Sequence, residues 1–155
     1  MRVVLVIVML YVVLCFVTDI KSRQMYSLPA NVLGVIIFVI NEIFNGGISL
    51  IVIMIVSFIV FRLMAKLKVW GEGDSDYLFM LTQLIAGMSI ENGIITFLVI
   101  ELITISVSLI ISVFIAFIET RVKKEKFSGR FKAAALPGFC IVTEVLCVIA
   151  WRIYE

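Results

Sequence analysis

The run ISLIVIMIVSFIVFRLMA at residues 48–65 contains a single charged side chain, Arg62. A helix needs roughly 20 mostly apolar residues to cross the hydrocarbon core of a bilayer. This run therefore predicts a membrane-spanning helix, and the rest of the chain can be organised around it.

Five further apolar runs accompany it: Val3–Thr18, Leu28–Phe44, Tyr77–Ile90, Gly93–Ile118 and Ala133–Trp151. Tyr77–Ile90 is short, so it must be sheltered by protein, extended through its polar flanks or matched by local thinning of the bilayer. We expect an all-α fold, a polytopic membrane helix bundle of about six transmembrane helices. Residues 1–155 should form one membrane-embedded domain.

The composition excludes a water-soluble globule. Of the 155 residues, 63% are hydrophobic and 15% are charged, and the mean hydropathy is +1.23, which leaves too little polar surface for water. The first run is followed by Thr18-Asp19-Ile20-Lys21 rather than by a small-residue cleavage site, so we interpret it as an uncleaved membrane helix. We expect membrane lipids as partners and no nucleic acid.

The basic residues are distributed unevenly between the connections. Eleven of the 13 Lys and Arg residues lie in three places: Lys21 and Arg23, the group Arg62, Lys66 and Lys68, and the segment 121–132. By the positive-inside rule these three places face the cytoplasm, and both termini lie on the other side. The chain is therefore expected to be a multi-pass protein of the cell membrane.

Two aspartates share the predicted cytoplasmic face. Asp19 follows the first apolar run, and Asp74 closes the tetrapeptide Gly71-Glu72-Gly73-Asp74 before the fourth. The glycines permit backbone angles closed to other residues, which suits a tight entry into a helix with Asp74 near its first turn. Two carboxylates held together can share one proton, as in aspartyl proteases. The alternative is that Asp19 terminates a helix and Asp74 caps one.

Four other acidic residues are candidates for secondary roles. Glu72 and Asp76 are either solvated interfacial charges or auxiliary residues of the site. Glu101 and Glu144 lie inside apolar runs, where an ionisable group is costly and faces protein or a water-filled cavity.

The three cysteines, Cys15, Cys140 and Cys147, lie in apolar runs, and the chain has no histidine. We expect them to pack as small buried hydrophobes. We expect no metal site and no cofactor.

The segments Asp19-Ile20-Lys21-Ser22-Arg23-Gln24-Met25 and Gly71-Glu72-Gly73-Asp74 resemble the motifs of the type IV prepilin peptidases and archaeal preflagellin peptidases. These are membrane aspartyl proteases with a Gly-x-Gly-Asp motif, and the resemblance extends over nearly the whole chain. It implies that Asp19 and Asp74 are catalytic, with Gly71, Gly73, Lys21 and Arg23 supporting the motifs.

The chain departs from the family pattern at two places. Tyr26-Ser27 replaces the usual Pro-Asn, with Leu28-Pro29-Ala30-Asn31 following, and Asp76 replaces a frequent lysine. The cytoplasmic domain with paired Cys-x-x-Cys motifs, found in many bacterial members, is missing from this sequence. The resemblance is therefore to the short, peptidase-only form.

The expected function is cleavage of the short basic leader from a prepilin-like precursor at the cytoplasmic face. The alternative is a small proton- or cation-coupled transporter, in which Glu101, Glu144 and the aspartates form a relay. A third possibility is a catalytically dead scaffold for pilus assembly. The sequence leaves open the substrate, the oligomeric state and which aspartate is the base.

Overall fold

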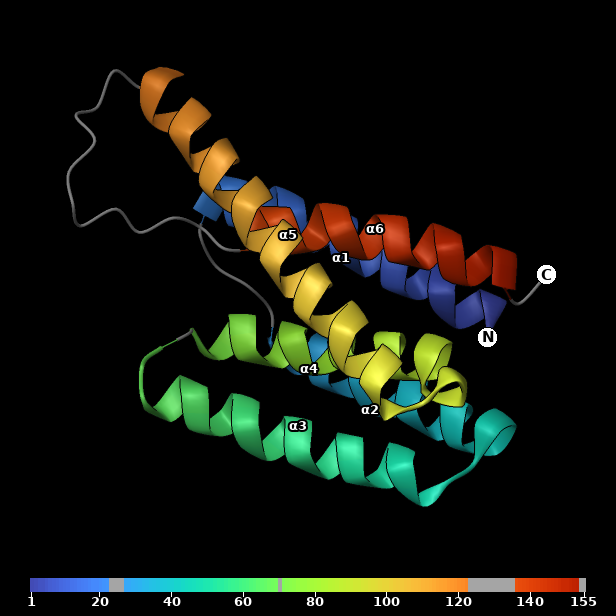
Figure 1. Cartoon of the computed structure of the whole chain (residues 1–155). Coiled ribbons are helices and arrows are strands. Elements are labelled where there is room, and N and C mark those ends of the chain that lie inside the picture. Colours follow the sequence, from blue (N-terminus) through green and yellow to red (C-terminus); the bar gives the residue numbers. More distant parts are fainter. Residues whose placement is uncertain (23–26, 70, 123–135, 154–155) are drawn as a thin grey trace.

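The computed structural model describes residues 1–22, 27–69, 71–122 and 136–153, and these segments are helical almost throughout (Figure 1). In chain order the elements are α1 (Arg2–Ser22), α2 (Ser27–Asn45), α3 (Ile48–Lys66), α4 (Glu72–Ser89), the short 3-10 helix η1 (Ile90–Asn92), α5 (Ile94–Val122) and α6 (Leu136–Ile153). The predicted all-α fold is confirmed.

The helices pack as two groups of three. In one group α6 lies between α1 and α5, and in the other α4 contacts both α2 and α3. Contacts of α4 with α5 and α6 join the groups. Figure 1 shows the start of α1 and the end of α6 at one end of the bundle, together with the α2–α3 turn. The α3–α4 connection, the end of α1 and the start of α4 lie at the opposite end, which we call the motif end.

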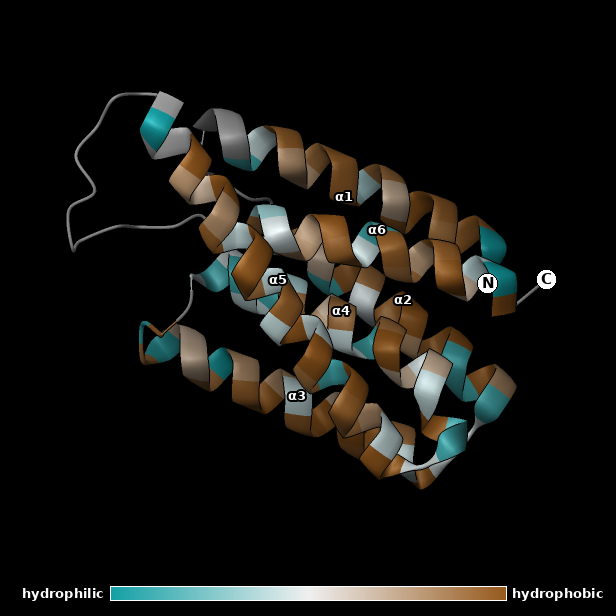
Figure 2. Cartoon of the chain, turned by 45° about the horizontal axis from the view of Figure 1, so that its top comes forward, coloured by the Kyte–Doolittle hydropathy of each residue, from teal (hydrophilic) through white to brown (hydrophobic). Residues whose placement is uncertain are grey.

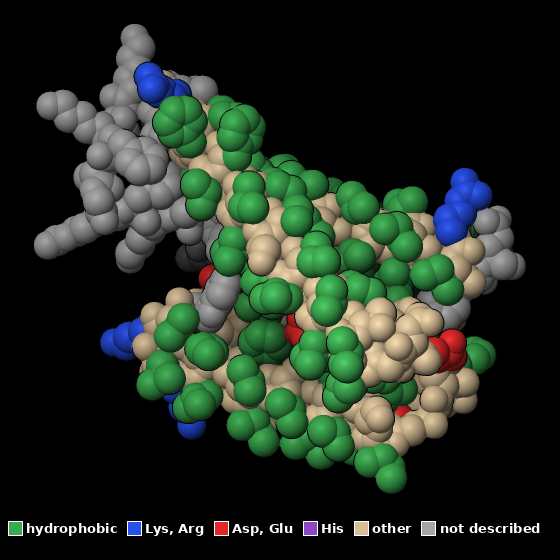
Figure 3. Space-filling model, viewed as in Figure 1, with side chains coloured by type: hydrophobic (Ala, Val, Ile, Leu, Met, Phe, Trp, Pro, Cys, Tyr) green, Lys and Arg blue, Asp and Glu red, His purple; other side chains and the backbone are tan. Residues whose placement is uncertain are grey.

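Five helices, α1, α2, α3, α5 and α6, are long and apolar enough to cross a membrane. Large apolar side chains point outward from α3 and α5, including Ile59, Leu102 and Ile110, whose exposed fractions are 58%, 68% and 68%. Figure 2 shows that hydrophobic residues run along both helices, and Figure 3 shows hydrophobic side chains on the surface over them. An apolar surface of this extent needs a cover, and together with the composition it identifies a membrane protein.

Helix α4 differs from these five because other helices enclose it. Its residues from Ser75 to Gly87 are all buried, although they include Asp76, Thr82 and Gln83. A helix surrounded by protein can carry polar side chains that lipid would not accommodate. The helix that contains the predicted run Tyr77–Ile90 begins at Glu72, and its neighbours shelter it.

Close contact between α2 and α4 depends on glycine. A Cβ atom at Gly34 would lie 2.7 Å from the ring of Phe79, and one at Gly87 would overlap the side chain of Asn41. Small residues let two membrane helices approach closely. The buried Asn41 amide then reaches α4 and donates a 2.9 Å hydrogen bond to the carbonyl of Gln83.

Some predicted boundaries were wrong. We expected the first helix to stop at Thr18, but α1 continues to Ser22, so Asp19 lies inside the helix. Likewise α5 continues past Ile118 to Val122. In each case the apolar run ends, but no Gly or Pro follows to break the helix. Residues 133–135 of the sixth predicted run lie outside the described residues.

Candidate active site

The Gly71-Glu72-Gly73-Asp74 motif forms the start of α4. Gly71 is the N-cap residue, and its carbonyl accepts the first helical bond from the Ser75 N–H at 3.0 Å. The Asp74 carboxylate folds back and accepts a hydrogen bond from the Gly71 N–H, which is half of a capping box. The predicted position of Asp74 in the first turn is confirmed.

Gly71 contributes space rather than an unusual backbone angle. Its φ is −65°, which any residue adopts. A Cβ atom at this position would lie 3.1 Å from the nearer carboxylate oxygen of Asp74, so a side chain would crowd the folded-back carboxylate. Gly73 lies within α4, and neither motif glycine has a positive φ, so the expected use of backbone angles closed to other residues is not found.

The Asp74 carboxyl is half-buried at this helix start. Burial raises the pKa of Asp74, and the hydrogen bond from the Gly71 N–H offsets part of that rise. A carboxylate in the first turn of a helix is ordinarily stabilised by the helix dipole. Here desolvation outweighs that effect, so Asp74 holds its proton more tightly than an ordinary aspartate does.

Asp19 lies near the end of α1, and its side chain is 8% exposed. It is close enough to interact electrostatically with the thiols of Cys15, one turn earlier on α1, and of Cys140 on α6. Asp19 is therefore directed toward the interior of the bundle at its motif end. The predicted motif residue Arg23 lies outside the described residues, as does the side chain of Lys21.

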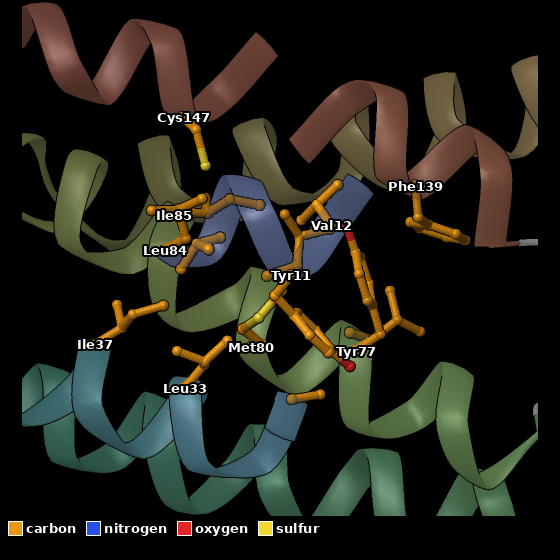
Figure 4. Packing of buried hydrophobic residues seen from close by; sticks show 14 of the residues in the cluster. Tyr11, Val12, Leu33, Ile37, Tyr77, Met80, Leu84, Ile85, Phe139 and Cys147 are labelled. Carbon is orange, nitrogen blue, oxygen red and sulfur yellow. The ribbon is translucent and has the colours of Figure 1, made fainter. Parts of the chain in front are cut away.

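Tyr77 marks a junction of α1, α4 and α6. Its hydroxyl donates a 2.8 Å hydrogen bond to the Thr143 hydroxyl of α6, which in turn donates to the Phe139 carbonyl at 2.7 Å. Cys140 of α6 and Cys15 of α1 also lie near the Tyr77 hydroxyl. Figure 4 shows Tyr77 reaching from α4 toward α6 within this packed region.

The junction relates the two aspartates to each other. Asp74 precedes Tyr77 by three residues, and Asp19 follows Cys15 by four, so each aspartate lies about one helical turn from the junction. Because α1 ends and α4 begins at the motif end (Figure 1), both displacements run toward that end. The structure thus brings Asp19 and Asp74 to the same end, on helices that both pack against α6.

Asp76 forms an ion pair with a residue of α3, an interaction that the sequence did not predict. Its carboxylate lies 3.2 Å from the guanidinium of Arg62, and Asp76 is 3% exposed. The guanidinium also lies over the ring of Phe58, 5.5 Å from its centroid. The interpretation of Asp76 as a solvated charge was therefore wrong, whereas Glu72 is exposed as a solvated charge would be.

The intramembrane glutamates have separate surroundings. Glu101 of α5 accepts a 2.6 Å hydrogen bond from the Thr82 hydroxyl of α4. Both line a cavity of about 230 Å³ between α3 and α5 whose walls are otherwise mostly apolar. Glu144 lies instead near Cys140 and Cys147 of its own helix.

The cysteines are free and buried, as predicted, and their exposed fractions are 2% or less: Cys15, Cys140 and Cys147. Two of them line the junction around Tyr77. Cys15 and Cys140 therefore fill space where α1, α4 and α6 come together.

Comparison of the chain with protein-family models, with curated proteins and with solved structures found no match.

Proposed function

We propose that this protein is a membrane aspartyl endopeptidase of the prepilin-peptidase type. Its substrate would be a prepilin-like precursor, from which it removes the short basic leader. One observation carries the proposal: Asp19 and Asp74 lie at the same end of the bundle, about one turn from the Tyr77 junction. The motifs that contain these aspartates support the same assignment.

The chemistry requires the two carboxyl groups to hold different protonation states. The ionised carboxylate acts as general base on a water molecule, and the protonated partner polarises the carbonyl of the scissile bond. The raised pKa of Asp74 favours retention of a proton within the pair. Since interacting carboxyls titrate together, the pH dependence of cleavage reports on the pair.

In the proposed topology the motif end faces the cytoplasm and both termini face the opposite side. Helix α4 then also crosses the membrane, enclosed by its neighbours, to give six spans. Among the described residues, the basic side chains at the motif end include Arg62, Lys66, Lys68 and Arg121, and Figure 3 shows basic clusters there. A precursor helix in the bilayer would present its leader junction at this face of the cell membrane.

The test is cleavage of a co-expressed prepilin, measured as a mobility shift. Asp19→Asn and Asp74→Asn should each abolish cleavage at normal membrane levels, because each removes one member of the carboxyl pair. Glu91→Gln provides the matched control, since Glu91 is an exposed acidic residue next to the α4–α5 turn at the opposite end. Full cleavage by either aspartate variant would contradict the mechanism and redirect attention to transport through Glu101 and Glu144.

A further inference from the structure

The hydrogen bond between Tyr77 and Thr143 occupies a particular place in the bundle. Tyr77 belongs to the helix that carries Asp74, and Thr143 belongs to α6, which packs along α1, the helix that carries Asp19. Both side chains are fully buried, with exposed fractions of 0%. The bond therefore links the two aspartate helices through one intermediary.

Three other side-chain hydrogen bonds of α4 join it to α2, α3 and α5. Asn41 binds the Gln83 carbonyl from α2, the Gln83 amide binds Ser57 of α3, and Thr82 binds Glu101 of α5. These bonds hold the middle of α4 against its other neighbours. The Tyr77 bond lies closer to Asp74 than these three bonds do, and it reaches α6, the helix that packs along α1.

The face of α4 that carries Tyr77 also carries Asp74. Residues three apart in a helix share a face, so Tyr77 and Asp74 lie on the same side of α4. That side meets α6 at Thr143 and Cys140 and approaches α1 at Cys15. A rotation or slide of α4 that broke the Tyr77 bond would therefore move the Asp74 carboxyl relative to α1.

We propose that Tyr77 and Thr143 are positioning residues that set the separation of the Asp19 and Asp74 carboxyl groups. This inference rests on the proposed peptidase function for its catalytic readout. The two hydroxyls act through the helix backbone and have no contact with the scissile bond. Their bond holds α4 in the register in which the aspartates can share a proton.

Conservative variants separate this role from packing. Tyr77→Phe removes one oxygen and keeps the buried ring, and Thr143→Val removes the hydroxyl at nearly constant volume. Each should lower kcat about 10- to 100-fold with little change in KM, because a shift of about 1 Å in catalytic groups has effects of this size. Thr143→Ser keeps the hydroxyl and should restore kcat.

The measurement is steady-state cleavage of a prepilin by purified protein in lipid nanodiscs. The matched control is Thr82→Val, which removes another hydroxyl hydrogen bond of α4 from a site five residues further along the helix. It should lower the unfolding temperature and leave kcat unchanged. The double variant Tyr77→Phe/Thr143→Val should be no slower than either single variant, because both lose the same bond.

A second measurement does not depend on cleavage. Spin labels at Val17→Cys on α1 and Glu72→Cys on α4 occupy exposed positions, whereas the native cysteines are buried. The distance distribution between the labels should broaden or shift on Tyr77→Phe and remain unchanged on Thr82→Val. If no prepilin is cleaved but the label distances change as expected, the proposed function is refuted and the positioning role stands.

Three outcomes would overturn the positioning role. They are an unchanged kcat and label distance in Tyr77→Phe, a Thr143→Ser variant as slow as Thr143→Val, and an equal loss of kcat in Thr82→Val. Each would show that the hydroxyl bond contributes to packing alone.

Discussion

The Arg62–Asp76 ion pair has one buried and one partly exposed member. The two side chains approach to 3.2 Å, and their exposed fractions are 43% for Arg62 and 5% for Asp76. The buried Asp76 carboxylate thus depends on a cation from α3 to balance its charge. Arg62 is partly exposed and also contacts the ring of Phe58. Loss of Arg62 should therefore affect stability differently from loss of Asp76.

Arg62→Ala should destabilise the protein more than Asp76→Asn does, because it leaves a buried carboxylate without its cation. Breaking a fully buried pair costs roughly 3–5 kcal/mol, and the exposure of Arg62 reduces our expectation to about 2 kcal/mol. Thermal unfolding in detergent measures the difference. The double variant should recover part of the loss, and an Arg62→Ala protein as stable as the wild type would show that the ion pair contributes nothing.

The raised pKa of Asp74 predicts how stability depends on pH. The unfolded chain releases this proton near the ordinary carboxyl pKa of about 4, whereas burial makes the folded protein hold it to higher pH. The contribution of Asp74 to folding is therefore complete below about pH 4 and is lost as pH rises through the folded-state pKa.

Asp74→Asn should consequently be more stable than the wild type at pH 8, and the advantage should shrink toward pH 4. Unfolding temperatures at the two pH values provide the measurement. Asparagine keeps an oxygen for the Gly71 N–H, so capping is preserved. A variant less stable than the wild type at pH 8 would instead identify the charged carboxylate as a helix cap.

Gly138 fixes the contact of α6 with α5. A Cβ atom there would overlap the backbone of Ser108, and the Gly138 N–H donates a 3.1 Å hydrogen bond to the Ser112 hydroxyl. Gly138→Ala should destabilise the protein by about 1–3 kcal/mol through overpacking. Gly47→Ala is the control, because a Cβ at Gly47 meets its nearest atom at 4.0 Å. Equal unfolding temperatures for the two variants would refute the close contact.

The proposed topology predicts the labelling of introduced cysteines. Val69 and Asn92 are exposed and lie next to the α3–α4 and α4–α5 connections, at opposite ends of the bundle. A membrane-impermeant maleimide should label Asn92→Cys in intact cells and Val69→Cys after permeabilisation. The buried native cysteines should give little background. The reverse pattern would invert the assignment of the cytoplasmic face.

The apolar runs were sufficient to predict the helices, because a segment such as residues 48–65 has few alternatives in a membrane. They were not sufficient to predict which helix is central. The run Tyr77–Ile90 stood out only as short, yet it belongs to the most enclosed helix, which also buries Asp76. Enclosure depends on how all the helices pack, which local hydropathy does not record.

The site could be predicted in part for the same reason. Asp19 and Asp74 stood out as charges next to apolar runs, and charge distribution placed them on one face. The bond from Tyr77 to Thr143 joins residues 66 apart, and each looked like an ordinary member of its run. Arg62 carried a usable signal, since a lone charge in an apolar run needs a partner, but its sequence context did not identify Asp76.

The enclosure of α4 also has a consequence for biogenesis. A segment with Glu72, Asp74 and Asp76 in its first five residues, and with Thr82 and Gln83 further along, gains less from entering lipid on its own than the more apolar helices do, because polar and ionisable side chains are costly in hydrocarbon. Under the proposed topology, α2 and α3 leave the ribosome first, and these are the helices that flank α4 on one side. Chain order thus provides α4 with a protein surface beside which it can enter, so a nascent chain that lacked the α2–α3 hairpin should leave α4 outside the bilayer.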